Sequence, residues 1–255
     1  MIVIDKLCYF SKLRRVNPEE KFGFAVISLL ICVISRSVTA ALILFAVNGF
    51  LNVKKGEIPF LRYMRLLLIP FAFFMLSTAA IMIDFSKIPL DAYAIPVGQW
   101  FITGSREGML RGMNLIVTAM SAVSCLYFLS LNTPMTEIME VLKRVHCPAV
   151  FIELMLLTYR FIFILMEEAD AVMTAQNARL GNRDFKTSLR SFGQMASMLF
   201  VRSLKKSFAL YDSMEARCYD GKIQILREGQ KAEKKEICLI ICFECLLLLA
   251  ACWRN

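Results

Sequence analysis

The sequence predicts an all-α membrane protein with about five transmembrane helices and a cytoplasmic region of long amphipathic helices. Of its 255 residues, 58% are hydrophobic and only 20% are charged, whereas an ordinary soluble domain carries about 25% charged residues. The 30 basic and 21 acidic residues are also unevenly spread. The 70 residues from 167 to 236 hold 23 of these 51 charges. This pattern excludes a soluble globular enzyme, a secreted disulfide scaffold and a disordered tail.

Apolar stretches near spanning length predict the membrane helices. About 20 helical residues cross a hydrocarbon core of about 30 Å. Residues 22–51 contain one charge, Arg36, and are too long for one span, so we expect two helices that turn at Ser35–Ser37. The predicted spans are 22–35, 37–51, 66–83, 108–131 and 237–252.

Lysine and arginine in the loops predict the orientation. Residues 1–21 and 52–65 are rich in both, which places these segments and the N-terminus on the cytoplasmic side. The loop 84–107 is poor in basic residues and is predicted to be external. The expected domains are a transmembrane bundle over 1–131, a cytoplasmic or interfacial domain over 132–236 and a transmembrane helix in 237–255.

Residues 147–166 are apolar enough to suggest a sixth span. However, Glu153, Arg160 and Glu167 are seven residues apart and share one helix face. Lipid would not surround such a polar stripe unless it had partners. We therefore predict an amphipathic helix beneath or partly inside the bundle, since a crossing would place the charged segment 167–236 outside.

Residues that carry catalytic or cofactor chemistry are scarce. His146 is the single histidine, and there is no G-x-x-x-x-G-K-[ST] sequence for ATP. Cys238, Cys242 and Cys245 have the spacing of an iron–sulfur loop, but they lie in an apolar run where cysteine acts as a small hydrophobe. We predict no catalytic residue, no metal site and no cofactor.

Two helices in the charged segment are predicted to end in similar tripeptides. One runs from Glu167 to Leu180 and stops at Gly181, and the other runs over about 189–219 before Asp220-Gly221. Their ends contain Ala178-Arg179-Leu180 and Ala216-Arg217-Cys218. Each arginine could simply complement the helix dipole. Alternatively, each guanidinium could grip a carboxylate of a partner in two places.

Four segments together resemble a known family. They are Asn17–Lys21, Tyr159–Ile162, Ala175–Gly181 and Tyr211–Gly221, together with Pro148. In order and spacing they are similar to the transmembrane (T) component of energy-coupling factor (ECF) transporters, especially its cobalt-type, CbiQ-like branch.

The resemblance implies a protein that docks two ATP-binding-cassette ATPase subunits through Ala-Arg-Gly-like motifs. ATP hydrolysis would belong to those partners, and metal recognition to a substrate-binding membrane (S) subunit of the cobalt type. The implied location is a bacterial or archaeal cell membrane, in contact with lipid. Leu180 and Cys218 depart from the motif, which has glycine there. The implied docking residues are Ala178, Arg179, Leu180, Ala216, Arg217 and Cys218, and the supporting residues are Glu153, Arg160, Glu167, Glu215, Gly181 and Gly221.

Two other functions fit parts of the sequence. A self-contained secondary permease would need ionisable groups within its spans, and Glu244 is the clear acid of this kind. A membrane-anchored basic module would use the net charge of +9 to bind acidic lipid or nucleic acid. Its aromatic residues form no stacking platform, so we expect no nucleic-acid partner. Nickel or an organic vitamin would leave the same sequence pattern as cobalt.

Overall fold

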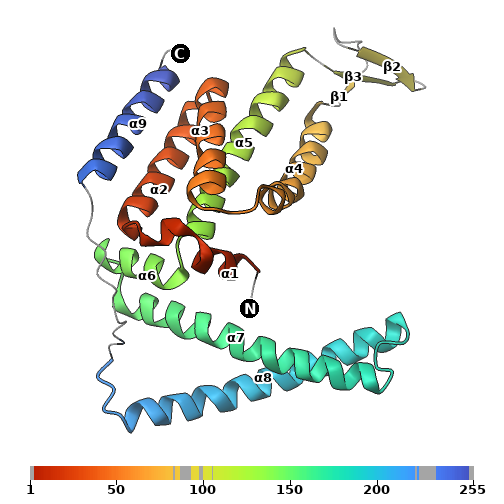
Figure 1. The fold of residues 1–255 in the computed structure, drawn as a ribbon. Helices are drawn as coiled ribbons and strands as arrows, with labels where there is room; N and C mark the ends of the chain where they lie inside the picture. The colour runs from red at the N-terminus through yellow and green to blue at the C-terminus, as the bar shows by residue number, and fades with distance from the viewer. Residues whose placement is uncertain are drawn as a thin grey trace. The chain divides into compact units, whose positions relative to one another are not determined.

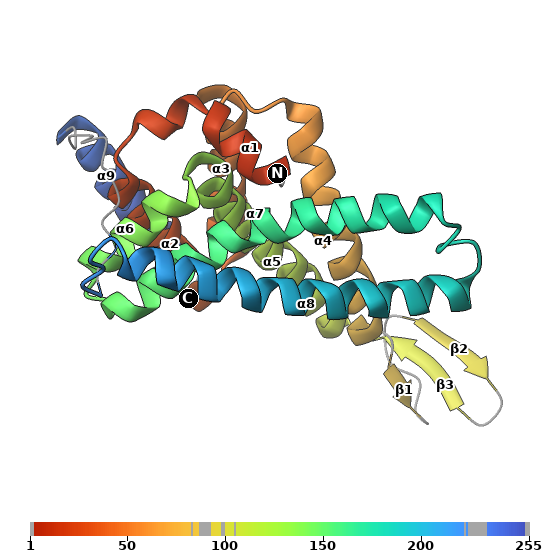
Figure 2. The same ribbon diagram turned by 90° about the horizontal axis from the view of Figure 1, so that it is seen from below.

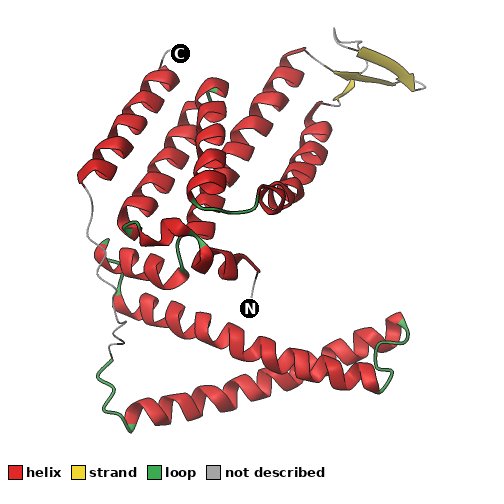
Figure 3. Cartoon of the chain, in the orientation of Figure 1, coloured by secondary structure: helices red, strands yellow, loops and turns green. Residues whose placement is uncertain are grey.

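The computed structural model describes residues 3–82, 84–86, 93–97, 100–104, 106–221, 223 and 234–252 (Figure 1). The all-α membrane fold is confirmed, because most of the described chain is helical (Figure 3). The chain forms two compact units. We call residues 2–138 with 228–255 the bundle unit, and residues 139–227 the long-helix unit.

The helices of the bundle unit follow the apolar stretches of the sequence. The helical segments of the bundle unit are α1 (Val3–Phe10), η1 (Lys12–Arg15), α2 (Pro18–Ser35), α3 (Val38–Phe50), η2 (Leu51–Lys55), α4 (Phe60–Met82), α5 (Arg106–Asn132) and α9 (Lys234–Cys252). A further helix, α6 (Met135–Arg144), begins in the bundle unit and ends in the long-helix unit.

The α2–α3 hairpin turns at the predicted place. Helix α2 ends at Ser35, Arg36 adopts a left-handed backbone with φ 47°, and α3 begins at Val38. At the other end of α2, the Asn17 side chain accepts a hydrogen bond from the Glu19 N–H at 3.0 Å, and Pro18 occupies the first turn. Both are strong helix-start signals, which explains why α2 begins there.

Helix α5 lies at the centre of the bundle unit and packs against α1, α2, α3 and α4. Helix α9 packs against α2 and α3. The apolar core consists of three clusters, each of which includes a residue of α5. They are Leu7, Ile58, Tyr63, Leu67 and Leu131; Cys32, Ala41, Leu44, Cys125 and Leu247; and Leu13, Phe24, Ala25 and Phe128.

A small antiparallel sheet interrupts the predicted loop 84–107. It has three strands, β1 (Asp84–Ser86), β2 (Tyr93–Val97) and β3 (Trp100–Gly104), in the order β1–β3–β2. The register pairs Asp84 with Thr103 and Tyr93 with Gly104. These strands were not predicted from the sequence; they are short and add no layer to the helical fold.

Among the residues that the structure describes, four helical segments are long and apolar enough to cross a membrane: Val38–Lys55, Phe60–Ala79, Gly108–Asn132 and Ala149–Ala178. The first three overlap the predicted spans 37–51, 66–83 and 108–131, whereas the predicted spans 22–35 and 237–252 are not among these segments. The fourth lies in the long-helix unit, where the sequence analysis predicts an amphipathic helix, so length and composition alone do not distinguish it from a span.

The long-helix unit is dominated by α7 (Ala149–Ala178) and α8 (Phe185–Glu215), of 30 and 31 residues. The segments 147–166 and 167–180 form one helix, α7, because no proline or glycine interrupts residues 149–178. The predicted boundaries of the second helix were also wrong. Helix α8 begins at Phe185, after Asp184 in extended conformation, and ends at Glu215 instead of 219.

Candidate functional site

Helices α7 and α8 pack against each other and are joined by the short loop 179–184 (Figure 2). Near the loop, the Gln176 side chain donates to the Ser191 carbonyl at 2.8 Å, and the Ser191 hydroxyl donates to the Gly181 carbonyl at 2.7 Å. Further along, Glu168 of α7 forms ion pairs with Lys206 and with Arg202, the latter at 3.4 Å. The contacts at Ser191 fix the end of α7 against the beginning of α8, and the ion pairs of Glu168 join the two helices further along.

The first tip, Ala178-Arg179-Leu180, ends α7 in a complete Schellman cap. Leu180 has a left-handed backbone with φ 58°. Its N–H donates to the Asn177 carbonyl at 3.1 Å, and the Gly181 N–H donates to the Gln176 carbonyl at 2.8 Å. These are the two hydrogen bonds that define the motif, in which Leu180 occupies the C′ position.

The second tip, Ala216-Arg217-Cys218, repeats the same geometry at the end of α8. Cys218 has φ 57°. Its N–H donates to the Glu215 carbonyl at 2.9 Å, and the Tyr219 N–H donates to the Met214 carbonyl at 3.1 Å. In both tips the arginine is followed by a left-handed third residue, although α7 ends at Ala178 itself and α8 ends at Glu215, one residue before Ala216. Two similar tripeptides therefore build two equivalent structures.

The predicted stop at Gly181 was wrong in detail. Leu180 and Cys218, which stand where the resemblance implied glycine, take the left-handed conformation themselves. Gly181 is needed for a different reason. A Cβ atom there would lie 2.9 Å from the Gln176 carbonyl oxygen and 3.0 Å from the Ser191 hydroxyl, so only glycine lets the loop approach both helices closely. Gly221, with φ 84°, has open space around it.

All three residues of each tip are exposed. Neither the Arg179 nor the Arg217 guanidinium forms an ion pair with another residue that the structure describes. Because the tips lie at the two ends of α8, its 31 residues separate them by about 46 Å. The structure therefore presents two separate guanidinium groups and does not bring them together.

A hollow of about 670 Å³ lies beside the second tip, between α7 and the end of α8. Arg160, Arg217 and Asp220 are among the residues that line it. Next to it, the Glu153 carboxylate accepts hydrogen bonds from the Tyr219 hydroxyl at 2.8 Å and from the Ile223 N–H at 3.1 Å. The hydrogen bond to this anion raises the pKa of the Tyr219 hydroxyl.

Of the predicted polar face of α7, formed by Glu153, Arg160 and Glu167, only part lies at this site. Glu153 and Arg160 lie near the second tip, whereas Glu167 is exposed. The acid that pairs with α8 is the neighbouring Glu168, which the sequence analysis did not select. Arg202 and Lys206, four residues apart on α8, are the signal that could have indicated an acidic partner. Glu215 is exposed, and its carbonyl serves the second cap.

The long apolar helices described above define an integral membrane protein of the helical class. Within this class, the chain belongs to the CbiQ family, described as cobalt transport proteins, which matches residues 10–226. It is thus a transmembrane component of an ECF transporter, of the cobalt-type branch, as its sequence motifs indicated.

Relatives from archaea and bacteria are similar to the chain over most of its length. An uncharacterized protein of Methanocaldococcus jannaschii is 33% identical over 98% of this chain and 92% of its own length. The cobalt transport protein CbiQ of Salmonella typhimurium is 29% identical over 87% of this chain and 98% of its own. The energy-coupling factor transporter transmembrane protein EcfT of Staphylococcus aureus is 24% identical, over 84% and 82%.

Proposed function

We propose that this protein is the coupling subunit of an ECF-type importer for cobalt ions. It would dock two ATP-binding-cassette ATPase subunits and pass their ATP-driven motion to a separate substrate-binding membrane subunit. The observation that carries the proposal is the repeated tip, in which an exposed arginine lies at a helix end that has the same two backbone hydrogen bonds and the same left-handed third residue at both positions.

The separation of the tips supports two docking partners. Helix α8 is continuous over 31 residues, so the two arginines lie about 46 Å apart. One carboxylate cannot reach both groups, whereas two partner subunits can each take one. A planar guanidinium can bind a carboxylate through two parallel hydrogen bonds, and a small alanine beside it leaves room for the walls of a groove.

The absence of a common ATP-binding motif supports a role for partner ATPases. The sequence contains no G-x-x-x-x-G-K-[ST] loop, the common route to nucleotide binding. The relatives that carry a functional name are transport components rather than enzymes. The name of the Salmonella relative supports cobalt as the cargo.

Docking requires both tips to lie on the cytoplasmic side, where ATP is found. We therefore propose that α7 lies along the membrane rather than across it, with the N-terminus in the cytoplasm. The exposed charges of Arg160 and Glu167 support this orientation, since lipid around the middle of a crossing helix would disfavour them. A crossing α7 would put the first tip on the opposite side of the membrane from the N-terminal end of that helix.

Charge reversal at the tips tests the proposal. In Arg179→Glu and Arg217→Glu, a carboxylate would meet the partner's carboxylate, so each variant should lower ATPase co-purification and ATP-dependent cobalt uptake. The double variant should lose both while it still inserts into the membrane. Uptake in proteoliposomes and pull-down of the ATPase subunits measure these effects.

Arg183→Glu is the matched control, because Arg183 is an exposed arginine just beyond the first tip. It should retain docking and uptake. ATP-dependent uptake at the wild-type rate in the double variant would overturn the docking assignment. Uptake by the purified chain alone, without nucleotide, would instead favour a self-contained permease.

A further inference from the structure

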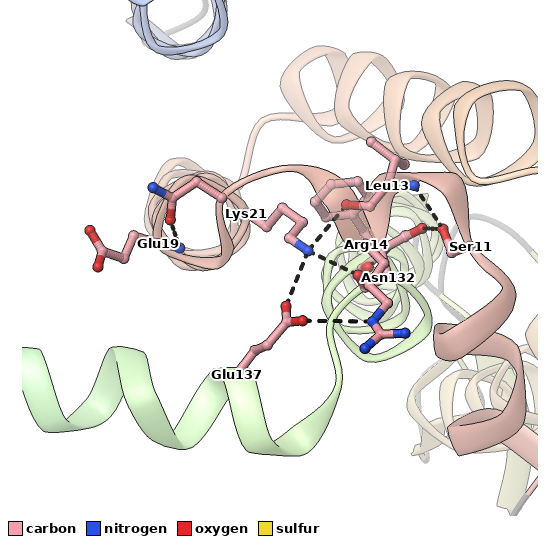
Figure 4. A network of polar contacts seen from close by, with 9 residues as sticks. Ser11, Leu13, Arg14, Glu19, Lys21, Asn132 and Glu137 are labelled. Atoms are coloured by element: carbon pink, nitrogen blue, oxygen red, sulfur yellow. Dashed lines mark hydrogen bonds and ion pairs between the residues drawn. The ribbon is translucent and has the colours of Figure 1, made fainter. Parts of the chain in front are cut away.

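A lysine in the N-terminal motif is buried at one end of the bundle unit. Lys21, near the start of α2, is 3% exposed. Its ammonium donates to the carbonyl oxygens of Leu13 at 3.2 Å and Asn132 at 3.1 Å, and it lies 3.6 Å from a carboxylate oxygen of Glu137 (Figure 4). An ammonium has three donors, so each N–H can face a different acceptor. These contacts offset part of the cost of burying the charge, although desolvation still lowers the pKa of Lys21.

The three acceptors come from three different segments. Leu13 belongs to η1, Asn132 is the last residue of α5 and Glu137 lies in the first turn of α6. The carbonyl of Asn132 has no partner within its own helix, and the negative end of the α5 dipole favours a cation there. Lys21 therefore joins α2 to all three segments through one charged group.

Hydrogen bonds of the Asn132 side chain also hold the end of α5 in place. Its side-chain oxygen accepts a hydrogen bond from the Ser11 hydroxyl at 2.6 Å, and its amide nitrogen donates to the Asn52 side chain at 2.7 Å. Ser11, Asn52 and Asn132 are all buried. The end of α5 is thus fixed within the bundle unit before α6 begins.

Glu137 is the point where this network reaches α6. Besides Lys21, its carboxylate lies 3.9 Å from the Arg14 guanidinium. The boundary between the two compact units falls between Ile138 and Met139, inside α6. Glu137 therefore holds the first turn of a continuous helix whose remainder belongs to the long-helix unit.

We propose that Lys21 and Glu137 form a clamp that transmits movement of the long-helix unit to helices α2 and α5 of the bundle unit. Lys21 and Glu137 are positioning residues, which touch neither nucleotide nor cargo. The clamp deepens the proposed function and rests on it for its role in transport. Without the ion pair, rotation of α6 would be absorbed at residues 133–138 instead of moving the bundle.

The test variant is Glu137→Gln, which keeps the size and hydrogen-bonding capacity of the side chain and removes the charge that faces Lys21. Glu140→Gln is the matched control, because Glu140 pairs with Arg144 at 3.6 Å inside the same helix. Both variants would be reconstituted as the full complex with the ATPase and substrate-binding subunits. Cobalt uptake and ATP hydrolysis would be measured on the same proteoliposomes.

We expect Glu137→Gln to assemble with the ATPases as the wild type does, because both tips are unchanged. Its cobalt uptake per ATP hydrolysed should fall by about fivefold or more, whereas Glu140→Gln should keep the wild-type ratio. An unchanged ratio in Glu137→Gln would overturn the clamp. A loss of uptake that merely follows a loss of assembled complex would also overturn it, since that result indicates a purely structural role.

Hydrogen exchange on the isolated chain separates failure of the clamp from failure of the proposed function. The amides of residues 137–144 should exchange faster in Glu137→Gln than in Glu140→Gln, while those of residues 149–178 should not change. Equal exchange in the two variants would contradict the clamp even if the complex transports cobalt. A wild-type chain that fails to bind any ATPase would contradict the proposed function and leave the exchange result to decide whether the clamp exists.

Discussion

The bundle unit and the long-helix unit are stabilised in different ways. In the bundle unit, α2 and α3 bury residues along their whole length, and polar side chains such as Asn48, Asn52 and Asn132 are fully buried. In α7 and α8 the buried residues are Ile152, Val172, Ser191 and Met195. The bundle unit thus has a packed interior, while the long-helix unit depends on capping motifs and a few polar contacts.

Helix α8 of the long-helix unit also exposes several large apolar side chains. Phe185 is 87% exposed, and Phe192, Phe200 and Phe208 are each at least 60% exposed. A helix pair with so little buried apolar area gains little from its own packing, and large exposed apolar surfaces mark sites of interaction. Because both tips of the long-helix unit are the proposed docking sites, this unit should be more sensitive than the bundle unit to the loss of the ATPase subunits.

Two glycines offer the strongest contrast between the units. A Cβ atom at Gly56 would lie 2.6 Å from the Asn52 carbonyl oxygen and 2.9 Å from the Asn132 side-chain oxygen. Gly56→Ala should therefore destabilise the bundle unit by about 1–3 kcal/mol. Gly193 lies inside α8 with nothing within 4 Å, so Gly193→Ala should stabilise α8 by about 0.5–1 kcal/mol.

Hydrogen exchange measures both changes in one experiment. Gly56→Ala should increase exchange in α5 and η2, and Gly193→Ala should decrease it in α8. If Gly56→Ala left the protection of α5 unchanged, the close packing around Asn132 would be wrong. Gly23→Ala is a suitable control in the bundle unit, because a Cβ there also meets nothing within 4 Å.

The tips should respond to glycine in a smaller and local way. Leu180 and Cys218 have φ values of 58° and 57°, a conformation that costs a residue with a Cβ about 1 kcal/mol. Leu180→Gly and Cys218→Gly remove this cost but increase the freedom of the unfolded chain. We therefore expect a net stabilisation below about 1 kcal/mol, seen as slower exchange at the Gly181 and Tyr219 amides.

Alanine provides the comparison at the same positions. Leu180→Ala and Cys218→Ala keep the Cβ atom, so the left-handed conformation stays as costly as in the wild type. Exchange at the Gly181 and Tyr219 amides should then match the wild type. Equal slowing by glycine and alanine would show that side-chain size, rather than backbone conformation, limits the caps.

The sequence predicted the parts of the fold that local chemistry determines. The Ser35–Ser37 turn was predictable because a 30-residue apolar stretch is too long for one span. The tips were predictable because Ala-Arg-x occurs twice at the end of a helical pattern. Leu180 was missed as the left-handed residue, because glycine at 181 is the usual C′ signal and only the close approach of Gln176 and Ser191 shows its other purpose.

Long-range pairs were not predictable from one sequence. Lys21 and Glu137 are 116 positions apart, and nothing in either local segment identifies the other as its partner. The same holds for Glu153 and Tyr219, which the return of the chain after α8 brings together. Helical periodicity assigns residues to a face, but it does not say which face of another helix lies opposite.

The smallest expected effect is that of Glu168→Gln, and Glu167→Gln in the next position is its control. The Glu168 carboxylate pairs with Lys206 and Arg202, whose side chains are 41% and 49% exposed, so solvent screens both contacts. Glu168→Gln should speed amide exchange in the middle of α8 by about twofold at low salt. Glu167→Gln removes an exposed charge one residue away and should leave that exchange unchanged.

In about 1 M salt the Debye length falls to about 3 Å, so the two variants should then behave alike. A difference between them that persisted at high salt would show that Glu168 holds the helices by packing rather than by charge, and the long-helix unit would then resemble the bundle unit more than its exposed surface indicates.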